Sequence, residues 1–225
     1  MSSGGHAESP TEDVDTDPWE RRFYYRDGDG TGFDRVVFFS DAVFAIALTL
    51  MAVEIGIPET PDSASPSALW SAIVDKGPAL LAYLVAFFWV AVYWRANHRF
   101  TGTLNRMSGR YIGVVLVFLA LIALLPFTAS MLGEYPNNPV AVVVFAVFAA
   151  VISSLEVVLI LVADRDGLFL RPLTAGERRY RVLGACTPLP GFLLSIPVAF
   201  ASTTLAVVCW FAGSVLFGWA TSKLK

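Results

Sequence analysis

Three polar residues at the start of an apolar stretch are the side chains of this sequence best suited to chemistry. The segment RVVFFSD places Arg35, Ser40 and Asp41 at the beginning of a run that is otherwise apolar. If this run is a helix that enters lipid at Arg35, Asp41 lies about 9 Å deeper along its axis. An ionised carboxylate at that depth costs about 2.5 kcal/mol or more without a partner, so we expect Asp41 to be buried against a polar or cationic group.

His98 is the expected partner of Asp41. It follows a second apolar stretch, in the segment WRANH, and depth matching places it at the same end of the membrane as Arg35, Ser40 and Asp41. These four side chains are therefore predicted to share one layer. Two interpretations stay open: a structural polar clamp that orients the helices, or a proton-sensitive or gating element.

The first apolar stretch also carries a regular stripe of apolar residues. Ile46, Leu50 and Val53 recur at i, i+4 and i+7, which places them on one face of a helix, and Thr49 lies beside them. Asp41 precedes Ile46 by five residues and is therefore about 140° away around the helix. The stripe is consistent with ordinary packing, or with a face that is turned to a partner or a pore.

Two further acids lie within apolar stretches, Glu54 and Glu156. Glu54 is near the far end of the first stretch, where it either draws cations to a pore mouth or simply reaches interfacial water. Glu156 lies about 10 Å inside the fourth stretch. We expect it to be buried in the bundle or protonated, and both a hydrogen bond to another helix and a proton path are open for it.

Signatures of catalysis and of cofactor binding are missing from the sequence. There is no phosphate-binding glycine loop, no HExxH, no GxSxG and no TVGYG potassium filter. The two cysteines, Cys186 and Cys209, lie in apolar stretches and lack metal-ligand spacing. We therefore expect no enzyme activity, no cofactor, no bound metal and no nucleic-acid partner.

The elements that position these residues are predicted to be six transmembrane helices. Of the 225 residues, 56% are hydrophobic and only 16% are charged, which is typical of a multi-pass membrane protein. The final uncharged stretch of 40 residues would reach about 60 Å as one helix, so it must fold back near residues 197–204. The expected spans cover residues 36–57, 77–94, 111–132, 139–163 and two halves of 182–221.

The placement of Lys and Arg predicts the orientation. With six spans, 15 of the 16 basic residues fall on one side of the membrane, and only Lys76 falls on the other. Because basic loops remain in the cytoplasm, both termini are predicted to be cytoplasmic. The predicted fold class is thus an all-α membrane protein, N-in and C-in. Residues 1–32 are predicted to be a disordered acidic cytoplasmic tail, and residues 33–225 the six-helix transmembrane domain.

The start of the first helix resembles the signature of a known family. Arg35, Phe39, Ser40 and Asp41, followed by AVFAI and then Thr49, resemble the motif of the transmembrane protein 175 family, which comprises potassium channels without a TVGYG filter. The resemblance covers residues 33–222. It implies a prokaryotic homotetramer in which the first helix of each subunit lines a central pore.

The resemblance also implies roles for individual residues. Ile46 would form the hydrophobic constriction, Leu50 and Val53 would add apolar rings toward the outside, and Thr49 would help to select K⁺ over Na⁺. Two departures from the family pattern bear on selectivity, namely Ala45 in place of a serine and Val53 in place of a leucine. The residues that would hold the pore helix are Arg35, Phe39, Ser40 and Asp41 on the first helix, with Trp94 and His98 on the second.

The function predicted from the sequence is a potassium-selective cation channel of the plasma membrane. K⁺ is the permeant ion, and the partners are the lipid bilayer and identical subunits. Two other classes are weighed against it: a secondary transporter or proton-leak pathway that uses Asp41, His98 and Glu156, and a membrane scaffold that conducts nothing.

Overall fold

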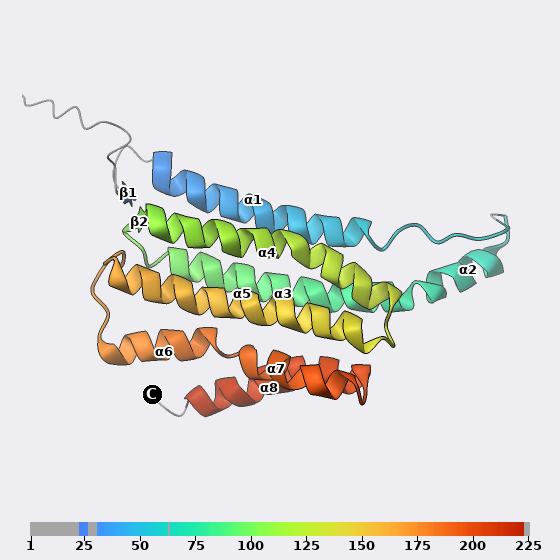
Figure 1. The fold of residues 1–225 in the computed structure, drawn as a ribbon. Helices are drawn as coiled ribbons and strands as arrows, with labels where there is room; N and C mark the ends of the chain where they lie inside the picture. The colour runs from blue at the N-terminus through green and yellow to red at the C-terminus, as the bar shows by residue number, and fades with distance from the viewer. Residues whose placement is uncertain (1–22, 27–30, 63, 223–225) are drawn as a thin grey trace, which may run out of the picture.

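The computed structural model describes residues 23–26, 31–62 and 64–222. Within these residues the chain is a bundle of roughly parallel helices with two very short strands (Figure 1). The elements in chain order are β1 (Phe23–Tyr25), α1 (Thr31–Val53), α2 (Pro66–Asp75), α3 (Gly77–Thr101), β2 (Arg106–Ser108), α4 (Gly109–Glu134), α5 (Pro139–Arg165), α6 (Ala175–Ala185), α7 (Leu189–Ala199) and α8 (Thr203–Ser222).

Six segments of the described chain are helical, long and apolar enough to cross a membrane. They confirm the prediction of an all-α membrane protein with six spans. The spans are Gly32–Val53, Gly77–Thr101, Gly109–Glu134, Pro139–Arg165, Ala175–Ala199 and Thr203–Thr221.

Capping side chains mark the starts of several helices. The Ser108 hydroxyl accepts a hydrogen bond from the Tyr111 N–H at the start of α4. Asn138 caps α5 in the same way, with a proline at the first helical position. These side chains satisfy N–H groups that have no partner inside the helix.

The fifth span differs from the prediction because it is divided. It begins at Ala175 rather than Val182, and it consists of α6 and α7, with Pro188 and Pro190 at the junction. Proline lacks the N–H that continues a helix, so the interruption is local. The turn from α7 to α8 lies at residues 200–202, within the predicted range.

Two glycines let α7 and α8 approach closely. A Cβ atom on Gly213 would lie 2.5 Å from the Cα atom of Gly191, and one on Gly191 would lie 2.6 Å from the Cys209 carbonyl oxygen. Small residues at a crossing allow this separation between backbones in membrane helices. Trp210, on α8, is fully buried and donates its indole N–H to the Ser195 hydroxyl at 2.7 Å.

The helix α1 lies at one side of the bundle, where it packs on α4 and α3 (Figure 1). β1 and β2 lie at one end of the bundle, and α2 projects from the opposite end (Figure 1). The predicted tail, residues 1–32, lies mostly outside the described residues. Its residues 23–26 and 31–32 are exceptions. Phe23–Tyr25 form a strand that pairs with Arg106–Ser108, and α1 already begins at Thr31, so these parts have regular structure instead of the predicted disorder.

Candidate functional site

The helix α1 has one buried and one exposed face. The buried face packs into the core through Phe33, Ser40, Phe44, Ala47 and Met51, each of which is at most 4% exposed. These positions recur at helical spacing, as an apolar face does when it docks on neighbouring helices. The remaining face of α1 is not covered by any other described part of the chain.

The predicted stripe occupies this exposed face. Ile46, Leu50 and Val53 are 57%, 45% and 72% exposed. Such exposure shows that the stripe is not core packing within this chain, and it leaves lipid, a second copy or a pore as the possible surroundings. Ordinary packing inside the chain, one of the two interpretations open from the sequence, therefore does not apply to this stripe.

Thr49 lies on the same exposed face. Its hydroxyl donates to the Ile46 carbonyl oxygen at 2.9 Å, one turn earlier in α1. A threonine hydroxyl has one hydrogen to donate and two lone pairs that accept. Because the hydrogen is used inside the helix, the oxygen keeps its capacity to accept or to coordinate a cation on the outward side.

Asp41 contacts α3 through Trp94. The indole N–H of Trp94 donates to the Asp41 Oδ1 atom at 2.9 Å, and the imidazole of His98 stacks on the indole with ring centroids 5.3 Å apart. The expectation that His98 itself pairs with Asp41 is therefore corrected. His98 lies four residues, or about 6 Å, nearer the helix end than Trp94, so Trp94 matches the depth of Asp41.

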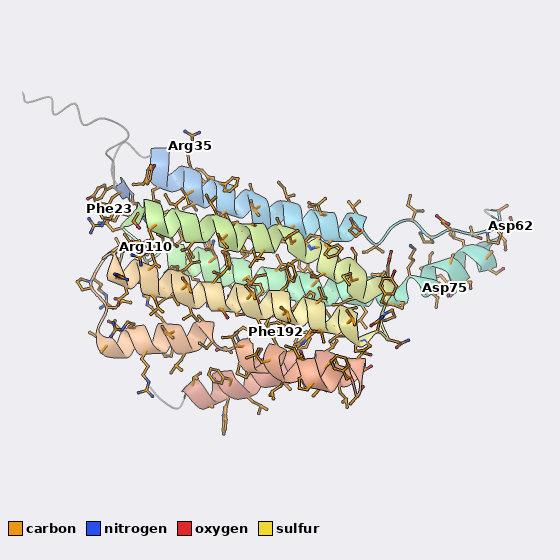
Figure 2. All side chains as sticks on the ribbon, viewed as in Figure 1. Phe23, Arg35, Asp62, Asp75, Arg110 and Phe192 are labelled. Carbon is orange, nitrogen blue, oxygen red and sulfur yellow. The ribbon has the colours of Figure 1, made fainter. Side chains whose placement is uncertain are left out.

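The other residues predicted for this layer do not all join it. The Ser40 hydroxyl is buried and donates to the Val36 carbonyl oxygen at 2.8 Å, inside its own helix. Phe39 is 51% exposed, and Arg35 projects from α1 away from the other helices (Figure 2). Within this chain, the side chains of the predicted clamp that contact one another are Asp41, Trp94 and His98.

Glu54 lies just beyond the end of α1, at the end of the bundle that carries α2. The Ser130 hydroxyl of α4 donates to its Oε2 atom at 3.1 Å. Glu54 also lines a pocket of about 390 Å³ together with Glu59, Asp75 and Lys76. The described residues contain no group of three His, Cys, Asp or Glu side chains arranged to hold a metal ion.

The opposite end of the bundle carries a feature that sequence reasoning missed. We name it the basic-end collar and define it as residues 23–26, 103–108 and 166–170. Backbone N–H groups link its three segments: Arg26 donates to Asn105 at 2.9 Å, Asn105 to Leu168 at 2.8 Å, and Leu170 to Thr103 at 3.0 Å. The collar therefore ties the segment before α1 to the loops after α3 and α5.

Arg106 is the central side chain of this collar. Its guanidinium lies 4.3 Å from the Phe23 ring centroid and donates to the Tyr25 hydroxyl at 3.2 Å and to the Gly167 carbonyl at 3.3 Å. Figure 2 shows Phe23, the first residue of β1, at this end of the bundle. The aromatic run at 23–25, which has high β propensity, was the signal for a strand within the acidic tail.

A chain of six membrane-length helices, whose first helix is exposed along one face and is held to α3 through Asp41 and Trp94, is a multi-pass membrane protein. A family model described as the endosomal/lysosomal potassium channel TMEM175 matches residues 35–126. A Streptomyces collinus protein named as a potassium channel is 30% identical over 183 residues, which are 77% of this chain and 85% of that protein. The chain belongs to the TMEM175 family.

Structural and animal relatives agree with this assignment. The crystal structure of a lysosomal potassium-selective channel TMEM175 homolog from Chamaesiphon minutus matches with a TM-score of 0.70 and 26% identity, over 84% of this chain and 97% of that chain. The human endosomal/lysosomal proton channel TMEM175 is 23% identical, and the match covers 84% of this chain but 40% of the human protein. The family therefore consists of ion channels rather than enzymes.

Proposed function

We propose that the protein is a homotetrameric, potassium-selective cation channel whose pore is lined by α1. The observation that carries the proposal is the exposed face of α1, on which Ile46, Thr49, Leu50 and Val53 have no covering element in the described chain. One helix cannot enclose a pore, so symmetry must supply the others. The relatives from Streptomyces and Chamaesiphon, which align with most of this chain, are named as potassium channels.

In this proposal the ring of four Ile46 side chains is the hydrophobic constriction. A narrow apolar ring blocks ions by excluding water, and opening requires it to widen until it holds water. Leu50 and Val53 form further apolar rings toward the outside. Thr49 supplies a ring of hydroxyl oxygens next to the constriction, and its internal hydrogen bond to Ile46 turns the acceptor side outward.

The clamp fixes the rotation of the pore helix. Asp41 is held by the Trp94 indole of α3, while the stripe of Ile46 and Leu50 lies on another side of α1. Because α1 is held on one side near its N-terminal end, its opposite side presents a defined face. Arg35, Phe39, Ser40 and His98 complete the proposed network around this contact, with Arg35 and Phe39 available to a neighbouring subunit.

Charge placement supports an N-in and C-in orientation in the plasma membrane. β1, the basic-end collar and the last turn of α8 gather at one end of the bundle (Figure 1). The basic residues of the described chain lie at that end, apart from Lys76 between α2 and α3. Basic segments are retained in the cytoplasm, so this end is assigned to the cytoplasmic side. Glu54 then belongs to an outer vestibule.

The test is ion flux into liposomes that contain purified protein, with K⁺ and Na⁺ compared for wild type, Ile46→Asn and Val151→Asn. Val151 is the matched control because it is an exposed apolar residue of α5 (43%), outside the proposed pore. We expect wild-type K⁺ flux that Ile46→Asn increases or makes less selective, because an amide wets the constriction. Val151→Asn should leave flux and selectivity unchanged.

The rival classes predict other outcomes of the same experiment. Equal effects of the two substitutions on ion flux would mean that α1 does not line the ion pathway. Flux that saturates at low ion concentration, or proton flux without K⁺ flux, would point to a transporter or proton leak through Asp41, His98 and Glu156. Absence of any ion flux from reconstituted protein would favour the scaffold.

A further inference from the structure

A large cavity lies away from α1, between α3, α5, α6 and α8. Its volume is about 800 Å³, and its lining is mostly apolar. Ligand pockets for small organic molecules fall in the range of about 300–1,000 Å³. The residues at one end of the cavity are Arg99, Thr103, Glu177 and Arg181, which belong to the basic end of the bundle, and Glu156 lies deeper, within α5.

Two residues that line this cavity carry a polar atom without a partner. The Glu156 Oε1 atom and the Trp89 Nε1 atom are both buried, and neither makes a hydrogen bond within the described part of the chain. Both residues line the cavity. A buried carboxyl group without a partner is costly in a membrane-spanning helix, so a ligand that brings a donor or a positive charge would be stabilised there.

Three aromatic rings form one wall of the cavity. Phe88, Trp89 and Phe211 contact one another, with ring centroids 5.2–5.7 Å apart, and all three line the space that Glu156 also lines. Aromatic faces attract cations, and the attraction is larger when the site is shielded from water. A cavity lined by both a carboxyl group and an aromatic wall is therefore complementary to an organic cation with an apolar body.

Two of the three charged side chains at the rim, Arg181 and Glu177, are already engaged. Arg181 donates to the Thr103 hydroxyl at 3.1 Å and lies 5.2 Å from the Phe169 ring centroid, and Glu177 pairs with Arg171. An anionic amphiphile would place its charge at the rim, and Glu156 would then remain without a partner. From this geometry we propose that the cavity binds lipophilic organic amines, with the ammonium group at Glu156 and the apolar body along Phe88, Trp89 and Phe211.

The proposal does not depend on conduction, so binding tests it directly. The probe is radiolabelled phenylbutylamine, measured on protein in lipid nanodiscs after subtraction of empty nanodiscs. Phenylbutanol and phenylbutyrate are competitors with the same body but neutral or negative head groups. We expect saturable binding of the amine, with both competitors weaker by at least about tenfold, which corresponds to about 1.4 kcal/mol.

Two pairs of variants assign the binding to this cavity. Glu156→Gln should weaken amine binding at least about tenfold, while Glu54→Gln, at the opposite end of the bundle, should not. Gly184→Phe is a plug, since Gly184 lines the cavity and a Cβ atom there meets nothing within 4 Å. It should abolish binding, while Gly113→Phe, which is equally unobstructed on α4, should not.

Several results would overturn the proposal. Equal competition by phenylbutanol would mean a chamber for lipid tails, and stronger competition by phenylbutyrate would mean an anion site at the rim. Unchanged binding in Glu156→Gln, or no saturable binding at all, would exclude Glu156 as the ammonium partner. If Glu156→Gln does not fold, as judged by gel filtration and circular dichroism, the Gly184→Phe and Gly113→Phe pair decides the location.

Discussion

The contact between Asp41 and Trp94 gives the sharpest test of how α1 is held. Trp94→Phe keeps an aromatic ring but removes the N–H that donates to Asp41 at 2.9 Å. A hydrogen bond to a charged group contributes about 1.5–3 kcal/mol, and the lower value applies here because Trp94 is 39% exposed. For a chain of this size, about 1.5 kcal/mol corresponds to a fall in Tm of about 3–6 °C.

The assay is thermal melting of purified protein in detergent, followed by far-UV circular dichroism. Asp41→Ala and the double variant complete a cycle, in which the double variant should lose about 1–1.5 kcal/mol less than the sum of the two single losses. Trp70→Phe is the matched control, because Trp70 is 67% exposed on α2 and its substitution should not change Tm. Additive losses in the cycle would refute the clamp.

Three further predictions concern other parts of the fold. Gly213→Ala should destabilise the protein by about 1–3 kcal/mol, because the new Cβ atom would lie 2.5 Å from the Gly191 Cα atom. Gly184→Ala should instead stabilise it by up to about 1 kcal/mol, because a Cβ atom there meets nothing within 4 Å. Denaturant titration measures both changes in the free energy of unfolding. Ser108→Ala should cost about 1–2 kcal/mol by the same titration, since Ser108 caps α4 and donates to the Asp166 Oδ2 atom at 2.6 Å; no loss would mean that the cap contributes nothing. Arg106→Gln should release β1, since each cation–π contact contributes about 0.5–1 kcal/mol. Limited chymotrypsin digestion should then cut faster after Tyr24 and Tyr25, whereas Arg179→Gln, on the exposed side of α6 and outside the collar, should leave the rate unchanged.

The helices that carry the site could be predicted because their signals are local. A run of about 20 apolar residues spans a bilayer whatever its neighbours are, so six spans follow from length and composition. The two faces of α1 follow from the i, i+4, i+7 recurrence of Ile46, Leu50 and Val53. The interruption before α7 is different, because Pro188 and Pro190 mark a break without showing whether the two helices still form one span.

Contacts between distant segments could not be predicted in the same way. Depth matching identified His98 as the partner of Asp41, but a position along the axis does not fix the rotation of α3. Its rotation places Trp94, four residues earlier, against the carboxylate. The collar likewise depends on the contact between Arg106 and Phe23, which are 83 residues apart in the chain. The aromatic run at 23–25 predicts a strand but does not indicate which segment pairs with it.

The sequence by itself therefore determined the membrane class, the number of spans, the family and the shared helix face of Ile46, Leu50 and Val53, because hydrophobic length, helical period and a contiguous motif are properties of neighbouring residues. Only the tertiary structure decided that Trp94 rather than His98 holds Asp41, that β1 closes a collar with the loops after α3 and α5, and that Glu156 and Trp89 share one cavity. Each of these depends on which helices are neighbours and how each is rotated, and such packing is set by the whole bundle rather than by any one segment.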